Sequence, residues 1–595
     1  MSLCRRVSEP RIYLCLLGLS ALLLAPAAIE SPFYLHVLVM VLFYAAIAQA
    51  WNIIGGFGGQ LSLGHAAFFG LGAYTSTLLF LQVGLSPWIG GLLGGLLAAL
   101  AAFAISYPCF RLRGPFFTLS TIAFGEVIRI LAIYFRGITK GSVGLQIPFR
   151  PSLANLVFRE KASYVYVALG FLLLTTGVAW WIERSKLGHA LVALREDEDA
   201  AEAVGINTHW SKLAAVMVSA FLTALGGTFY AQFVLFIEPY SVFSGDISTQ
   251  VALVAIIGGI GTVSGPIIGS FIVTPLSEFS RAWLGGSFRG LHFFVYGVVL
   301  IVVVILIPRG IGDWLRPPFR WLLGRLPGWR PLESPAPAAA PTVDPVERAA
   351  AADGYLLECR QVSKSFRGLV AMQAVDLRIR RGEIVGLIGP NGAGKSTFFN
   401  VITGFHVPDR GEVLFAGERI SQIRSPHRII RRGIGRTFQV VKPFGNVTVL
   451  ENVVVGAFCR TADPRLARSE AVRVLAMVGM AGKMEVLARS LTIADRKRLE
   501  LARALATRPQ LLLLDEVMAG LNQPEVEEMI GVVRRIRDQG VSVLVIEHVM
   551  RVIMSLCDRI VVLHHGEKIA EGTPAEIGAD RRVIEAYLGE EYLIA

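Results

Sequence analysis

The chain has 595 residues, more than one hydrophobic core can organise, so it is expected to fold as several units. Apolar residues make up 53% of it and its 6 cysteines are scattered without a CxxC pair, which argues against a disulfide framework and a zinc site. The formal net charge is +12, and the basic residues cluster beside apolar runs, as flanks of membrane helices do, so a membrane surface is favoured over nucleic acid. These clusters are residues 5–6, 111–113, 184–186 and 316–330.

The long apolar runs all lie before about Arg316, and this half of the chain is predicted to lie in a bilayer. Each predicted crossing has roughly the twenty apolar residues that a crossing needs. The first follows Arg5-Arg6 and is interpreted as a signal anchor. The basic loops near Arg111 and Arg184 are predicted to be cytoplasmic, with an inside N-terminus. The predicted crossings are residues 12–29, 33–54, 66–83, 88–107, 115–135, 164–182, 212–236, 250–274 and 291–307.

The loop at residues 183–211 carries a short amphipathic helix. Its apolar stripe lies beside the acidic run at residues 196–199, and Gly205 is suited to end the helix. The stripe consists of Leu191, Leu194, Ala201 and Val204. The loop is either a solvated connector or a docking helix for a cytoplasmic domain.

Residues 331–352 are rich in Pro and Ala with few apolar anchors, which is typical of a linker. We therefore expect a membrane domain at residues 1–330, of about 8–10 spans with one or more re-entrant, and a soluble domain at residues 353–595.

The soluble half opens with a GxxxxGK[ST] phosphate loop between a predicted strand and a predicted helix, which is the context that this motif requires. The glycines let backbone N–H groups turn toward a polyphosphate, and the helix N-terminus adds its partial positive charge. Lys395 is expected to reach the outer phosphates and Ser396 to ligate Mg²⁺. The predicted nucleotide-binding residues of this loop are Gly389, Asn391, Gly392, Gly394, Lys395, Ser396 and Thr397.

Two later apolar runs end in chemistry-bearing side chains. Residues 511–514 are four leucines followed by Asp515-Glu516, and residues 541–546 are followed by Glu547-His548. At the end of a strand, one carboxylate can orient Mg²⁺ while the next polarises the attacking water. Because ligands of open α/β sheets bind at the carboxyl ends of parallel strands, the imidazole is expected at the same edge.

In these motifs, the segment from about Leu356 to the end resembles an ABC transporter ATPase. The expected fold class is thus a polytopic all-α membrane domain followed by an α/β P-loop ATPase of the ABC type. The resemblance implies binding of ATP and Mg²⁺, with Asp515 and Gln439 joining Ser396 at the metal. The other implied roles are the catalytic glutamate Glu516, the Q-loop glutamine Gln439, the switch histidine His548 and the adenine-stacking aromatic Phe366.

One motif departs from the family pattern. Where the signature reads LSGGQ, this chain has residues 491–495, LTIAD. In the family this loop closes over the nucleotide of the opposite ATPase, so Thr492 and Ala494 are expected to contact that nucleotide. Thr492 keeps a hydroxyl, Ala494 adds a Cβ where glycine allows the closest approach, and Asp495 is expected to bring negative charge toward the γ-phosphate, with Arg496 and Lys497 compensating.

The membrane half resembles the permease of branched-chain amino acid (Liv-type) importers from about Ala45 to Gly310. The residues that carry this resemblance are 51–56 (WNIIGG), 61–65 (LSLGH), 70–74 (GLGAY), 113–117 (RGPFF), 124–126 (FGE) and 193–198 (ALREDE). Asp199-Ala200-Ala201 with Gly205 resembles part of the EAA loop of ABC importer permeases, which favours docking on an ATPase.

Nine crossings from an inside N-terminus would leave the ATPase outside the cell, where no ATP is available. One segment is therefore expected to be re-entrant, split or missed. The Gly-rich stretches at residues 55–64 and 258–269 are the candidates, because irregular backbone at membrane depth survives only where protein or a cavity covers it.

The resemblance predicts a natural fusion of two subunits of a bacterial inner-membrane ABC importer that takes up branched-chain or other neutral amino acids, with its ATPase in the cytoplasm. The expected partners are a second permease, a second ATPase, an external substrate-binding protein and membrane lipid, with no nucleic acid. Uptake of urea or short amides, and an ATP-dependent membrane regulator or sensor, remain alternatives. An exporter is disfavoured because the permease comes first and has a separate coupling loop.

Overall fold

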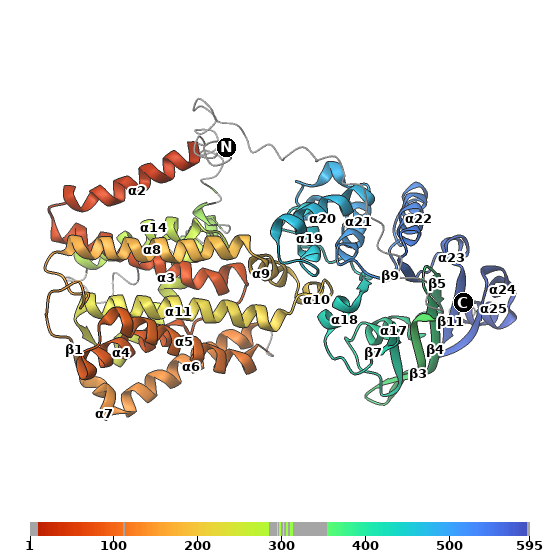
Figure 1. The fold of residues 1–595 in the computed structure, drawn as a ribbon, viewed down its shortest axis with the longest axis horizontal. Helices are drawn as coiled ribbons and strands as arrows, with labels where there is room; N and C mark the ends of the chain where they lie inside the picture. The colour runs from red at the N-terminus through yellow and green to blue at the C-terminus, as the bar shows by residue number, and fades with distance from the viewer. Residues whose placement is uncertain are drawn as a thin grey trace. The chain divides into compact units, whose positions relative to one another are not determined.

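The computed structural model describes residues 10–110, 114–284 and 354–591, with a few single positions between 294 and 314. The chain divides into two compact units. The first is a helical unit of residues Met1–Arg195 and His209–Ser334, and the second combines Glu196–Thr208 with Pro335–Ala595 (Figure 1). The predicted linker at residues 331–352 lies outside the described residues, as does most of the predicted crossing at residues 291–307.

The helical unit contains, within the described residues, seven helices long and apolar enough to cross a membrane. Its first, α3, is buried along almost its whole length, whereas α6 exposes apolar side chains such as Phe116 and Leu119. An apolar helix surface of this kind is stable only against lipid or protein. With the shorter ones included, the helices of this unit whose bounds the structure describes are α2 (Pro10–Ala28), α3 (Pro32–Asn52), α4 (His65–Val83), α5 (Pro87–Cys109), α6 (Pro115–Tyr134), α7 (Arg136–Thr139), α8 (Lys161–Arg184), α9 (Lys186–Glu196), α11 (Thr208–Val234), α12 (Pro239–Val242), α13 (Gly245–Gly259) and α14 (Gly265–Leu284).

Both Gly-rich stretches interrupt the α-helical backbone. After α3 the chain forms a π-helical turn, η1 (Ile53–Phe57), and then irregular backbone as far as α4. The expected single crossing at residues 250–274 is divided between α13 and α14. Asn52 joins the two breaks, since its Oδ1 accepts the Gly261 N–H at 2.9 Å and its Nδ2 donates to the Thr262 carbonyl at 2.9 Å. A Cβ on Gly56 would lie 1.8 Å from Asn52 Oδ1, so only glycine fits there.

The second unit is an α/β fold around a six-stranded sheet of order β12-β11-β5-β10-β9-β8, in which only β12 runs antiparallel to its neighbour. A second sheet has the order β4-β3-β6-β7. The strands are β3 (Tyr355–Phe366), β4 (Leu369–Arg380), β5 (Ile384–Ile388), β6 (Arg410–Phe415), β7 (Glu418–Arg419), β8 (Ile434–Arg436), β9 (Leu511–Asp515), β10 (Ser542–Ile546), β11 (Arg559–His564) and β12 (Glu567–Gly572).

The six-stranded sheet has a core on each face. Along β9, Leu512 and Leu514 pack among helices on one face of the sheet. Leu511 and Leu513 lie on the other face, in a core shared with β3, β4 and α17 (Lys395–Ile402). A continuous apolar run is what a strand covered on both faces requires. The helices are α10 (Glu198–Glu202), α17 (Lys395–Ile402), α18 (Pro426–Arg432), α19 (Val449–Ala457), α20 (Pro464–Met477), α21 (Ile493–Leu505), α22 (Gln523–Asp538), α23 (Met550–Leu556), α24 (Pro574–Ala579) and α25 (Arg581–Glu591).

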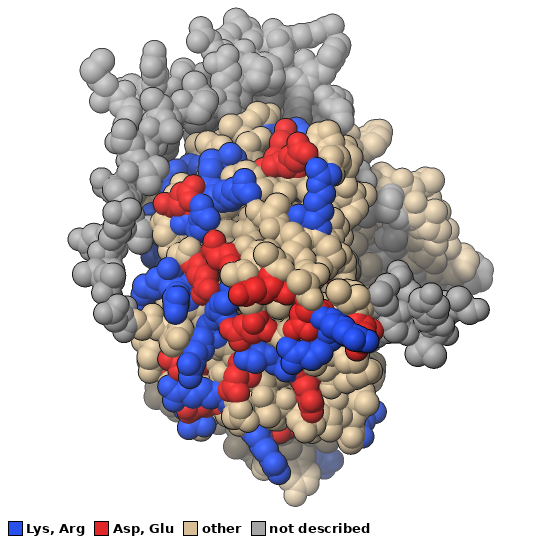
Figure 2. Space-filling model, turned by 90° about the vertical axis from the view of Figure 1, so that its right-hand side faces the viewer, with Lys and Arg blue, Asp and Glu red and all other residues tan. Residues whose placement is uncertain are grey.

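The charged side chains on the face drawn in Figure 2 are mixed in sign. Lys and Arg are interspersed with Asp and Glu rather than gathered into one positive patch. The net charge of +12 is therefore not concentrated on this face. Exposed pairs of opposite charge contribute little individually to stability.

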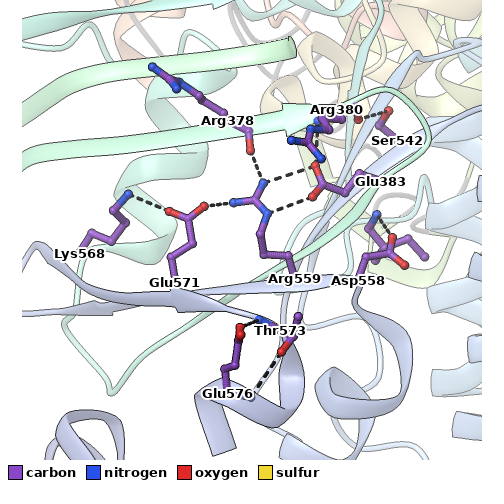
Figure 3. A network of polar contacts seen from close by, with 11 residues as sticks. Arg378, Arg380, Glu383, Ser542, Asp558, Arg559, Lys568, Glu571, Thr573 and Glu576 are labelled. Carbon is purple, nitrogen blue, oxygen red and sulfur yellow. Dashed lines mark hydrogen bonds and ion pairs between the residues drawn. The ribbon is translucent and has the colours of Figure 1, made fainter. Parts of the chain in front are cut away.

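A partly buried exception is Arg559 at the start of β11. Its Nε donates to Glu383 Oε1 at 3.0 Å, another guanidinium nitrogen donates to the Arg378 carbonyl at 2.6 Å, and the third bonds Glu571 (Figure 3). Lys568 also contacts Glu571, at 2.8 Å. One guanidinium thus ties together β4, β11, β12 and the start of β5.

We expect Arg559→Met to destabilise the ATPase unit by about 2 kcal/mol, because Glu383, Glu571 and the Arg378 carbonyl each lose a donor. For a unit of this size the midpoint of thermal unfolding should fall by about 5 °C. Arg581→Met is the matched control, because Arg581 pairs with Glu585 on the surface and its loss should change stability by less than about 0.5 kcal/mol. Equal midpoints for the two variants would contradict this role of Arg559.

Candidate nucleotide site

The phosphate loop joins β5 to α17 and depends on three glycines with positive φ. These are Gly389 (φ 151°), Gly392 (φ 79°) and Gly394 (φ 97°). A Cβ on Gly389 would lie 2.1 Å from the Leu563 carbonyl oxygen, and one on Gly394 would lie 2.5 Å from that of Ala371. Side chains are therefore disfavoured by conformation at all three glycines, and at Gly389 and Gly394 also by lack of space. The backbone can then present its N–H groups, with Asn391 in the loop and Ser396 and Thr397 in the first turn of α17.

Lys395, the first residue of α17, folds back over the loop. Its Nζ donates to the carbonyls of Gly389 at 2.6 Å and Pro390 at 2.8 Å. These contacts hold the ammonium group beside the loop, where a polyphosphate would meet both the N–H groups and the positive charge.

Three predicted catalytic residues come together at the carboxyl ends of β9 and β10. Glu516 Oε1 lies 2.5 Å from His548 Nε2, and Glu516 Oε2 accepts a hydrogen bond from Gln439 Nε2 at 3.0 Å. The Glu516 backbone has a φ of 49°, an uncommon conformation for a residue with a side chain. Such strain is concentrated at functional sites, where the surrounding structure enforces it. Here the Glu516 N–H donates to the Ile546 carbonyl and Lys497 donates to the Glu516 carbonyl.

Asp515 is buried next to this group. Its Oδ2 lies 3.5 Å from a guanidinium nitrogen of Arg436, and its N–H donates to Thr437 Oγ1. Burial raises the pKa of Asp515, and Arg436 opposes that rise. Among the described residues, Asp515 Oδ1 has no hydrogen-bond partner. A buried carboxylate oxygen without a donor suits a divalent cation, so these residues fit Mg²⁺.

Phe366 ends β3 and keeps 38% of its surface exposed. The ring of His406 meets it edge-on, with centroids 5.1 Å apart, and Lys364 Nζ lies 5.5 Å from its centroid. Burial and the neighbouring Lys364 lower the pKa of His406. An open aromatic face suits stacking on a base. His406 was missed in the sequence analysis, because nothing local marks a histidine beyond α17 as a neighbour of β3.

The signature segment is held by contacts within the ATPase unit. Thr492 caps α21: its Oγ1 accepts the Asp495 N–H at 3.2 Å, and its hydroxyl lies 3.0 Å from Asp495 Oδ2. Lys483 Nζ reaches the same Oδ2 at 2.5 Å, so Asp495 does not present an uncompensated charge. Arg496 and Lys497, the cations expected to compensate Asp495, donate to the carbonyls of residues 489, 516 and 519. Ala494 is buried and Ile493 is exposed.

The loop between α9 and α11 belongs in part to the ATPase unit, which contains Glu196–Thr208. Asp197 accepts the Ala200 N–H as the cap of α10, and its other oxygen lies 3.0 Å from Lys442 Nζ. Asp199 lies 3.7 Å from the same ammonium group. Glu196 accepts from Asn446 Nδ2 at 3.0 Å. The acidic run therefore makes polar contacts within the ATPase unit.

The apolar stripe of this loop is divided. Leu191 packs with Ile54 and Phe57 in the helical unit, and Leu194 is buried in the same unit. Val204 is buried in the ATPase unit, next to Gly205, on which a Cβ would lie 2.6 Å from Cys459 Sγ. The expected docking role of Leu194 stays a prediction.

The fold and this site define an ATP-hydrolysing cassette of the ABC type, joined in one chain to a helical membrane domain. Three family models match. Residues 33–304 match the permease component of branched-chain amino acid transport systems, residues 372–519 match ABC transporters, and residues 567–592 match branched-chain amino acid ATP-binding cassette transporters.

The chain is similar to curated relatives over its ATPase half. It is 38% identical over 251 residues to the high-affinity branched-chain amino acid transport ATP-binding protein BraF of Pseudomonas aeruginosa, covering 40% of this chain and 98% of BraF. It is 39% identical over 251 residues to LivG of Escherichia coli, again covering 40% of this chain and 98% of the relative. A crystal structure of an ABC transporter cassette in its ADP conformation matches at 30% identity and a TM-score of 0.37, covering 40% of this chain and 99% of that one. The chain belongs to the branched-chain amino acid ABC transporter family.

Proposed function

We propose that the chain is the fused permease and ATPase subunit of an importer of branched-chain or other neutral amino acids in the bacterial inner membrane. The ATPase unit lies in the cytoplasm, where ATP is available. The resemblance of both halves to branched-chain amino acid systems supports this substrate class. The proposed order of domains is a membrane domain at residues 1–330, a linker at residues 331–352 and an ATPase domain at residues 353–595.

The observation that carries this proposal is the attachment of α10. This helix lies in sequence between α9 and α11 of the helical unit, yet Asp197 and Asp199 bind Lys442 of the ATPase unit. When the ATPase unit moves, α10 moves with it and pulls on α9 and α11, the two helices joined to it in sequence. A membrane-bound regulator without transport would not need such a link.

Hydrolysis is assigned to residues that lie together. Glu516 polarises the attacking water, His548 and Gln439 orient Glu516, and Lys395 with the loop N–H groups holds the phosphates. Asp515, Ser396 and Gln439 would hold Mg²⁺, which would neutralise negative charge on the phosphates. The adenine is assigned to the exposed face of Phe366.

The complete transporter contains more than this chain. Alternating access in this family uses two permeases and two ATPases, and the chain supplies one of each. Each nucleotide is closed over by the opposite signature, and here Thr492 and Ala494 replace the usual Ser and Gly. We therefore propose a second permease, a second ATPase with its own signature, and an external binding protein that delivers the amino acid.

The test is transport by the purified assembly in proteoliposomes. A substrate-binding protein of a branched-chain amino acid system and labelled leucine are supplied on one side, and ATP is supplied on the ATPase side. We expect leucine to accumulate on the ATP side only while ATP is hydrolysed, and the assembly to contain one copy of this chain. Movement away from ATP would indicate export, movement of urea or short amides alone would indicate the other substrate class, and hydrolysis with no transported solute would favour a regulator.

A further inference from the structure

Three charged residues of α21 lie on one buried stripe. Lys497, Glu500 and Arg503 follow at intervals of three residues, and each is almost inaccessible to solvent. Buried charges are costly unless they are bonded, so each is expected to have a partner with a defined geometry. A solvated helix face would not bury them.

Each side chain of this stripe holds the backbone of another segment. Lys497 Nζ donates to the carbonyls of Glu516 at 2.8 Å and Ala519 at 2.5 Å. Glu500 Oε1 accepts the Phe438 N–H at 2.8 Å. Arg503 donates to the Lys442 carbonyl at 2.8 Å.

The segment from Phe438 to Lys442 is thus fixed at both ends by one helix. It contains Gln439, whose side chain donates to Glu516 at 3.0 Å, and it ends at the lysine that binds Asp197 and Asp199. Only one peptide bond separates the Phe438 N–H from Gln439. A displacement of the Phe438 N–H therefore moves the side-chain amide of Gln439 away from Glu516.

We propose that Glu500 is a positioning residue for ATP hydrolysis: by accepting the Phe438 N–H it sets the place of Gln439 on Glu516. Glu500 touches neither nucleotide nor water in this role. Lys497 fixes the backbone of Glu516 from the same helix, so α21 holds both partners of the Gln439–Glu516 contact. The signature segment begins this helix, and its movement is passed to the catalytic pair through Glu500.

An oxygen acceptor at this position matters more than a negative charge. Burial raises the pKa of Glu500 to about 7, against the opposing effects of Arg503, the Phe438 N–H, Lys497 and Arg436. Both protonation states keep an oxygen that can accept the N–H. A glutamine side chain has the same length as glutamate and also carries an acceptor oxygen. An aspartate side chain keeps the negative charge, but it is shorter by one methylene and its oxygens lie farther from the Phe438 N–H.

The experiment compares Glu500→Gln, Glu500→Asp and Glu500→Met in the assembled transporter. We expect the glutamine variant to keep at least about half of the parent kcat, and the aspartate and methionine variants to lose about tenfold in kcat with little change in KM for ATP. A charge requirement would reverse the order of glutamine and aspartate, and would overturn the proposal.

The matched control is Glu470→Met, which removes another buried carboxylate, bonded to Arg473 and Arg508, away from the segment 438–442. Thermal midpoints are measured for all variants. If Glu470→Met loses kcat as much as Glu500→Met at an equal midpoint, Glu500 is only structural. Should Glu500→Met fail to fold, the comparison of kcat between Glu500→Gln and Glu500→Asp still tests the proposal.

Discussion

Replacing Glu516 by glutamine is expected to stop ATP hydrolysis while nucleotide binding persists. Glutamine keeps the shape of the side chain and can still contact His548 and Gln439, but it cannot accept the proton of the attacking water. We expect kcat to fall by about 10²–10⁴, the usual contribution of a general base. The measurement is hydrolysis by the assembled transporter together with binding of a fluorescent ATP analogue.

Lys395→Ala is the contrasting variant, because it removes the ammonium group that lies over the phosphate loop. It should lose both binding and hydrolysis, since the outer phosphates lose a charge-assisted contact. Glu527→Gln serves as the control, as its carboxylate contacts only Gln523 on α22 in the described structure. Full turnover by Glu516→Gln would remove Glu516 from the catalytic role, and unchanged binding by Lys395→Ala would remove the lysine from phosphate binding.

The ATP-binding half was largely predictable because its signals are local. A glycine-rich loop between a strand and a helix needs certain residues at certain spacings, and the four leucines before Asp515 mark a strand buried on both faces. Since parallel strands bring their carboxyl ends to one edge, the convergence of Glu516 and His548 followed from topology.

The features that could not be predicted depend on contacts between segments far apart in the sequence. Nothing in the sequence near Asp495 indicates that it pairs with Lys483, which lies in a separate 3-10 turn before α21. Glu500 and Arg503 look like the exposed face of an amphipathic helix, although both are buried. The helical periodicity of Leu191 and Leu194 identified an apolar face correctly, but periodicity does not tell which neighbour covers that face.

Reversing the charge of Lys442 is expected to lower transport selectively, without stopping ATP hydrolysis. This lysine is the cation that Asp197 and Asp199 of the loop share, at 3.0 and 3.7 Å. Its backbone carbonyl accepts from Arg503, so the residue remains in place when its side chain is changed. Lys442→Glu turns two attractions into repulsions, which we expect to weaken the attachment of α10 by about 1–2 kcal/mol at these partly exposed positions.

We expect Lys442→Glu to lower amino acid uptake on the order of tenfold while ATP hydrolysis changes less than about twofold, because the variant alters the link and leaves Glu516 and Lys395 intact. Adding Asp197→Asn and Asp199→Asn should restore much of the uptake. Asparagine removes the repelling charges, and at position 197 it still caps α10 by accepting the Ala200 N–H. Arg432→Glu is the control, since Arg432 is an equally exposed cation paired with Glu418. If uptake and hydrolysis fall together, or if Asp197→Asn and Asp199→Asn do not restore uptake, the acidic run does not transmit the motion of the ATPase.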